Sequence, residues 1–132
     1  MTSEQIMAFT AVDPLKYLDL ARELSTKTES EVRRTAADRA YYAAFLFSRD
    51  QLALKDYIVP FYREQDKYDV SRKLKELKYG IGNSEHLLRT RRTKITYDTR
   101  DVGSPSLDWM IDTAQKIINY VKALAVNPTI KN

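Results

Sequence analysis

The scarcity of chain-breaking residues constrains the fold of this sequence more than any other feature. Three glycines and four prolines occur in 132 residues, so the chain has few positions at which a regular segment must end. No segment alternates apolar and polar residues in the way that a half-buried strand does. The sequence therefore predicts an all-α fold, an antiparallel up-and-down bundle of four to five helices.

The first two helices are marked by residues that favour helix starts. Asp13 followed by Pro14 is typical of a cap and the first helical position, which predicts a first helix of about three turns. Thr28 and Glu31 have the spacing of a capping box, so a second helix is expected to begin there and to run to about Leu54. A helix of that length spans roughly 40 Å, enough to cross a small domain.

The middle of the chain predicts a loop and two shorter helices. Residues 55–69 hold a proline and several aromatic and charged side chains, which predicts a loop with short turns. An amphipathic helix is expected over residues 70–77. Glycine and asparagine in residues 79–83 predict a turn, after which Ser84 is expected to cap a fourth helix that leads to a cluster of arginines.

The last helix has the clearest pattern. Ser104 and Pro105 repeat the cap-then-proline signal, and the connection before them is expected over residues 99–103. Apolar residues then recur at helical spacing over nearly five turns. They are Leu107, Met110, Ile111, Ala114, Ile117, Ile118, Val121 and Leu124. Asn127 and Pro128 are expected to close the element.

The second helix is apolar or aromatic over much of its circumference. Its alanine-rich stripe would let a neighbouring helix approach closely. Arg39, Tyr41, Tyr42 and Phe45 interleave with that stripe, so the helix must be covered on more than one side. A second copy of the chain could supply one cover, and a homodimer is therefore expected.

The composition favours one domain, residues 1–132, with its core at about 14–125. A chain of this length with 43% hydrophobic residues can bury one core and is too short for two. The chain has no cysteine, which excludes disulfides and thiolate metal sites, and no metal ligands cluster, so no cofactor is expected. The start has no basic region before an apolar run, and no window reaches the length of a membrane span. A cytoplasmic protein that does not enter the membrane is expected.

Positive charge is concentrated in one segment. The net charge is +4, but residues 71–94 carry eight basic residues against two acidic ones, a local excess of six. Such a confined excess is what a nucleic-acid-binding face would show, although a solvated helix surface gives the same count. Aromatic residues in 55–69 could stack bases but more often pad a core.

The stretch from Leu87 to Asp98 is the most informative for function. It joins clustered cations to a Tyr–Asp pair, and Arg92 and Tyr97 fall within about one and a half helical turns. A guanidinium suits phosphate oxygens, so this pair could hold a phosphate and orient a hydroxyl. The same cluster is also typical of a solvated helix end that complements the helix dipole. His86, the sole histidine, lacks a nearby carboxylate or second ligand in the sequence and is interpreted as a surface residue.

Two motifs together resemble the HEPN domain family of prokaryotes. They are the run Arg-Ala-Tyr-Tyr-Ala-Ala-Phe at residues 39–45 and the later segment at residues 88–98, and the resemblance covers about residues 14–125. It implies an antiparallel bundle of four or five helices, usually a homodimer. The family is often encoded beside a small nucleotidyltransferase, and many members are metal-independent ribonucleases that act as toxins restrained by that partner.

The resemblance also implies roles for particular residues. Arg92 matches the arginine of the family's arginine–histidine signature, whereas Tyr97 stands where the histidine is expected; these two are the catalytic candidates. A tyrosine, with an ordinary pKa of about 10, is poorly matched to taking a proton from a 2′-hydroxyl at neutral pH. The phosphate-binding candidates are Arg89, Arg91, Arg92 and Lys94. The supporting candidates are Arg39, Tyr42 and Asp98.

Three functions follow as hypotheses. The leading one is a HEPN-like dimer that binds RNA or nucleotides and works with a nucleotidyltransferase partner, with catalysis weak or absent. The first alternative is an active metal-independent ribonuclease of a toxin–antitoxin pair that uses Arg92 and Tyr97. The second is a purely structural dimerisation module whose basic helix is solvated surface.

Overall fold

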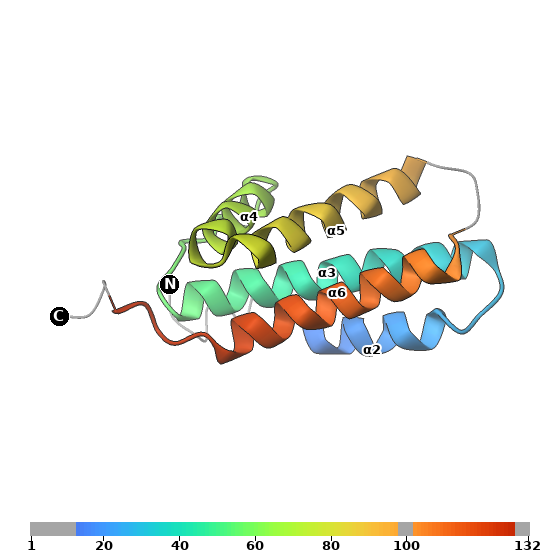
Figure 1. Cartoon of the computed structure of the whole chain (residues 1–132), viewed down its shortest axis with the longest axis horizontal. Coiled ribbons are helices and arrows are strands. Elements are labelled where there is room, and N and C mark those ends of the chain that lie inside the picture. Colours follow the sequence, from blue (N-terminus) through green and yellow to red (C-terminus); the bar gives the residue numbers. More distant parts are fainter. Residues whose placement is uncertain (1–12, 98–101, 129–132) are drawn as a thin grey trace.

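The computed structural model describes residues 13–97 and 102–128, which form five helices and no strand (Figure 1). The helices are α2 (Pro14–Leu24), α3 (Ser30–Leu54), α4 (Gln65–Leu77), α5 (Tyr79–Tyr97) and α6 (Ser104–Ala123). The prediction of an all-helical fold is confirmed. Within the described ranges, no helix is both long enough and apolar enough to cross a membrane.

The long helices α3 and α6 lie side by side, with α2 and α5 on opposite sides of the pair and α4 against the first half of α5 (Figure 1). Arg33, near the start of α3, donates hydrogen bonds to the Val102 carbonyl and to the Ser104 hydroxyl at the start of α6. Lys55, directly after α3, donates to the Val121 carbonyl near the end of α6. These bonds show that α3 and α6 begin at the same end of the molecule.

The predicted helix starts are right at α2 and differ in detail at α3 and α6. Asp13 caps α2 as expected, because its carboxylate accepts a hydrogen bond from the backbone N–H of Leu15. The capping box at Thr28 is wrong: α3 begins at Ser30 and has no side-chain cap. Ser104 is the first residue of α6 rather than its cap, and its hydroxyl is used by Arg33 instead.

The predicted turn at residues 79–83 is also wrong, because these residues form the first turns of α5. Helix α4 begins earlier than expected, and Lys78 is the one residue between α4 and α5. Ser84 lies inside α5, where its hydroxyl donates to the Gly80 carbonyl. Gly82 is required for packing rather than for a turn: a Cβ atom there would lie 2.3 Å from the Lys75 backbone nitrogen. Tertiary contact with α4 therefore outweighs the local tendency of glycine to end a helix.

Helix α3 is covered within its own chain. Its alanines 36, 40, 43 and 44 are fully buried, and so is Tyr41. Helices α2, α4, α5 and α6 all pack against α3. The apolar circumference of α3 therefore does not require a second subunit, and this argument for a homodimer fails; the homodimer itself stays a prediction.

The loop between α3 and α4 is held by one buried carboxylate. Asp66, in the first turn of α4, accepts hydrogen bonds from the backbone N–H groups of Phe61 (2.9 Å) and Tyr62 (2.8 Å). Tyr62 has a φ of 58°, a left-handed conformation that these contacts stabilise. The result is a fixed entry into α4, which places the side chains that follow it against α5.

Candidate functional site

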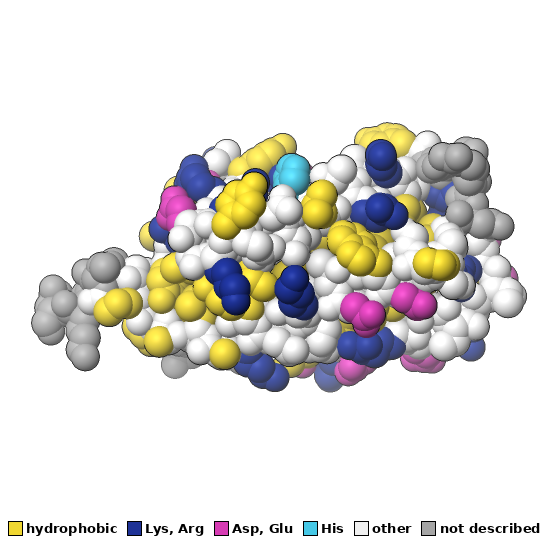
Figure 2. Space-filling model, in the orientation of Figure 1, with side chains coloured by type: hydrophobic (Ala, Val, Ile, Leu, Met, Phe, Trp, Pro, Cys, Tyr) yellow, Lys and Arg dark blue, Asp and Glu magenta, His cyan; other side chains and the backbone are white. Residues whose placement is uncertain are grey.

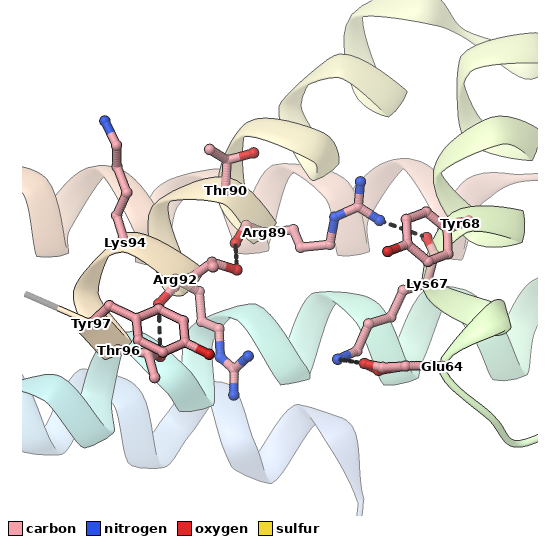
Figure 3. A pocket seen from close by; sticks show the side chains of 10 residues that line it. Glu64, Lys67, Tyr68, Arg89, Thr90, Arg92, Lys94, Thr96 and Tyr97 are labelled. Atoms are coloured by element: carbon pink, nitrogen blue, oxygen red, sulfur yellow. Dashed lines mark hydrogen bonds and ion pairs between the residues drawn. The ribbon is translucent and has the colours of Figure 1, made fainter.

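A groove lies between the start of α4 and the second half of α5, with a volume of about 440 Å³ (Figure 3). We call it the cationic groove. Its lining residues are Glu64, Lys67, Tyr68, Arg89, Thr90, Arg92, Thr93, Lys94, Thr96 and Tyr97. Four of these side chains are cationic and one is a carboxylate, so the groove is suited to an anionic ligand.

Arg92 is held at the floor of this groove. Its Nε donates to Asp38 of α3 at 2.8 Å, and its guanidinium lies 5.1 Å from the centre of the Tyr42 ring. Burial alone would lower the pKa of Arg92, but the hydrogen bond to Asp38 and the nearby Tyr42 outweigh burial and raise it. Arg92 is therefore a fixed cation whose terminal nitrogens remain available to a ligand.

Asp38 also faces a second arginine. Arg39 Nη1 lies 4.0 Å from the second Asp38 oxygen, and the Arg39 guanidinium lies over the Tyr17 ring of α2 at 4.9 Å. Arg39 thus points towards α2 and contributes to the groove only through Asp38. The predicted supporting role of Arg39 would therefore be indirect, through Asp38.

Arg89 forms the wall between α4 and α5. Its guanidinium donates to the Lys67 carbonyl and lies 5.0 Å from the centre of the Tyr68 ring. Its Nη2 lies 2.9 Å from His86 Nδ1. Three contacts fix this side chain before any ligand binds, as expected for a pre-organised phosphate-binding group.

Lys67 and Glu64 form an ion pair at 2.7 Å on the α4 side of the groove, as Figure 3 shows. The hydrogen bond to Lys67 lowers the pKa of Glu64. Burial acts to lower the pKa of Lys67, but its bond to Glu64 and the adjacent Tyr42 raise it. Tyr42 therefore supports two cations of the groove, since its ring lies under both Lys67 (5.6 Å) and Arg92.

The remaining predicted residues do not all meet in the groove. Lys94 and Tyr97 line it, and Tyr97 is 84% exposed with no hydrogen bond to Arg92. Arg91 is the exception: it donates to Ser106 of α6 at 2.7 Å, lies over the Trp109 ring and does not line the groove, so its assignment to the phosphate-binding set stays a prediction that the groove does not support. Asp98 lies outside the described residues.

Three further residues at the groove were left out of the predicted site, although two of them lie in the segment noted for possible base stacking. Asp38, Lys67 and Tyr68 come from α3 and α4, and only the fold brings them to α5. Asp38 could have been noticed as a lone carboxylate among the alanines of the second helix. Lys67 and Tyr68 lie in the segment interpreted as a loop with possible base-stacking residues, and the structure places them at the start of a helix instead.

The described residues contain no group of three or more histidine, cysteine or acidic side chains that could hold a metal ion. The chain matches no protein-family model, no curated protein and no solved structure. Its function is therefore argued from the groove and from the resemblance of its motifs.

Proposed function

We propose that this chain is a HEPN-like helical module that binds single-stranded RNA or nucleotides in the cationic groove, with catalysis weak or absent. The observation that carries the proposal is the composition of the groove, which combines four cations with two exposed aromatic rings. Tyr68 is 60% exposed and Tyr97 is 84% exposed. Aromatic faces stack bases of any sequence, while fixed cations hold the phosphates, which is how sequence-tolerant single-strand binders work.

The polar groups of the groove complement a phosphodiester. Lys67 and Arg92 are each paired with one carboxylate and keep further N–H donors, whereas Lys94 is exposed and has no partner among the described residues. Arg89 is paired with neutral groups, so its full positive charge faces the groove. A phosphate offers acceptor oxygens only, so these donors and charges suit it.

Weak catalysis is proposed because the groove holds no side chain suited to take up a proton near pH 7. The sole histidine of the chain, His86, does not line the groove. Glu64 is paired with Lys67, and Arg92 stays charged at neutral pH. Cleavage of RNA without a metal needs a group that takes up the 2′-hydroxyl proton near pH 7, and tyrosine is poorly matched to that task.

The proposal also covers the arrangement of the helices, a homodimer and a protein partner. An up-and-down order of consecutive helices is supported by α3 and α5 being antiparallel, because Arg92 meets Asp38 while the later Ile95 carbonyl meets the earlier Arg34. The neighbours α3 and α6 are parallel, so the proposed arrangement is antiparallel between consecutive helices and not between all neighbours. The resemblance supports a homodimer and a nucleotidyltransferase-type partner. A neighbouring reading frame for such an enzyme, and its co-purification with this chain, would test the partner.

RNA binding is tested with a fluorescein-labelled deca-uridine and fluorescence anisotropy over a salt series. About three phosphate contacts at roughly 0.7 each give a slope near −2 for the logarithm of the binding constant against the logarithm of salt. Lys94→Gln should weaken binding and flatten this slope. Arg91→Gln is the matched control, because it removes one charge from the same helix but on the side that contacts α6. If the two variants have equal effects, or if no binding occurs at low salt, RNA binding in the groove is refuted. The alternative of a structural module with a solvated basic helix then stands.

A further inference from the structure

A second concave site adjoins the cationic groove and shares Tyr68 and Arg89 with it. It has a volume of about 610 Å³ and lies between α4 and α5. Its other lining residues are Ser71, Arg72, Lys75 and Glu76 of α4 and His86 of α5. We call it the α4–α5 hollow. Figure 2 shows the histidine side chain reaching the surface next to hydrophobic side chains on this face.

The free polar groups of the hollow are mostly donors. Lys75 has no hydrogen-bond or ion-pair partner among the described residues. Arg72 is exposed and pairs with Asp69 at 3.0 Å, which leaves further N–H groups. A guanidinium can only donate, so His86 Nδ1 accepts the bond from Arg89 and its Nε2 carries the hydrogen. Burial, with Arg89 and Lys75 nearby, lowers the pKa of His86, so the ring presents a neutral N–H donor at pH 7.

Two acidic groups lie at or beside the hollow, and neither presents an uncompensated charge to a ligand. Glu76 lines the hollow, but Lys73 binds it at 2.7 Å and offsets its charge. Glu85 is fully buried behind Ser71, whose hydroxyl donates to it. Burial raises the pKa of Glu85, which reduces the negative charge beneath the hollow.

Tyr68 stands between the two concave sites. One face of its ring is covered by the Arg89 guanidinium at 5.0 Å, while 60% of the residue remains exposed. The cation fixes the ring and leaves its other face open. A base stacked there would have the cations of the groove on one side and those of the hollow on the other.

From this shared wall we infer that the α4–α5 hollow is a second phosphate subsite, so that one RNA strand crosses from the groove to the hollow with a base stacked on Tyr68. The inference rests on the proposed function and extends it by assigning Lys75, Arg72 and His86 to the strand. It also predicts a footprint longer than the groove alone would give.

The first experiment measures the salt dependence of deca-uridine binding by Lys75→Gln. Loss of one phosphate contact should flatten the logarithmic salt slope by about 0.7. Lys78→Gln is the matched control, because Lys78 directly follows the same helix, carries the same charge, is exposed and lines neither concave site. Arg72→Gln supplies a second variant at an exposed position, where the side chain pairs with Asp69. Its slope should flatten as well.

The second experiment isolates stacking. Tyr68→Ala should weaken deca-uridine binding by at least about fivefold, the lower limit for one stacked base, and should not change binding of an abasic phosphate backbone of equal length. Tyr68→Phe, which keeps the ring, should bind both probes as the unsubstituted protein does.

The outcomes separate the two ideas. If Lys75→Gln and Lys78→Gln behave alike while Lys94→Gln still flattens the slope, the second subsite is refuted and the groove is retained. If Tyr68→Ala weakens both probes equally, the stacked base is refuted. If the unsubstituted protein does not bind deca-uridine at low salt, the proposed function fails, and the second subsite fails with it.

Discussion

Replacing Glu85 by glutamine should stabilise this protein at neutral pH, by an amount that grows as the pH rises. Glu85 is fully buried, and its Oε1 has no hydrogen-bond partner among the described residues. Ser71 donates to its other oxygen, and Arg89 and Lys75 exert a smaller favourable influence on its charge. Burial dominates these effects and raises the pKa of Glu85 in the folded state.

The sign follows from proton linkage. A carboxyl whose pKa is raised on folding binds its proton more tightly in the folded state than in the unfolded state. The associated stability is fully present below the unfolded pKa of about 4.3 and is lost as the pH rises to the folded pKa. One such group changes the free energy of unfolding by at most about 1.4 kcal/mol per pH unit in that window. Glutamine is isosteric and neutral throughout, so it removes this loss.

The measurement is urea-induced unfolding of both proteins at several pH values from about 3 to about 8. The free energy of Glu85→Gln minus that of the unsubstituted protein should rise with pH from about 4.3 and then become constant. His86 also titrates in this range, but it is present in both proteins and largely cancels in the difference. Glu76→Gln is the control: binding of Lys73 lowers the pKa of Glu76, so its difference should fall as the pH rises to about 4.3 and stay constant above that, where the Glu85→Gln difference rises. A flat or falling difference for Glu85→Gln would refute the assignment of a desolvated carboxyl.

Three further predictions test packing, chemistry and assembly. Gly82→Ala should destabilise the protein by about 1–3 kcal/mol, because its Cβ would meet the backbone of α4 at 2.3 Å. Gly80→Ala should stabilise the helix, because a Cβ there meets nothing within 4 Å. Equal effects of the two variants on urea-induced unfolding would contradict the close approach at Gly82. The unsubstituted protein should cleave RNA slowly or not at all. Tyr97→His should gain cleavage that a chelator does not inhibit and that adding Arg92→Ala abolishes on the same RNA. Robust cleavage by the unsubstituted protein that Tyr97→Phe removes would favour the nuclease alternative. Light scattering at micromolar concentration should give twice the chain mass of 15.4 kDa, and a clean mass of one chain would remove the homodimer from the proposal.

Some parts of the fold that depend on local chemistry were predictable from the sequence. The Asp13 cap of α2 follows from adjacent residues, and the Ser104–Pro105 signal gives the start of α6 to within one residue, whereas the local capping-box signal at Thr28 failed. The α4–α5 corner was not predictable in this way. Gly82 has the local signal of a turn, and it is helical because two helices touch there, which depends on residues that fold onto it from α4.

The candidate site likewise contains residues that a local pattern identified and residues that only the fold brings together. Arg92 was recognised from its motif, but its partner Asp38 lies 54 residues away in the sequence, and no local pattern connects the two. Arg91 and Arg92 are neighbours in the chain and differ by about 100° around the helix. One faces the groove and the other faces α6, so the orientation of α5 had to be known to tell them apart.

The single-residue connection at Lys78 has a consequence for how fast a ligand can bind. Because one extended residue joins α4 to α5, and because the helices touch at Gly82, the angle between them is set before any ligand arrives. A strand that contacts both helices would meet a surface whose shape does not need to change. Association should then show one kinetic phase whose rate follows diffusion and ionic strength rather than a slower rearrangement of the protein.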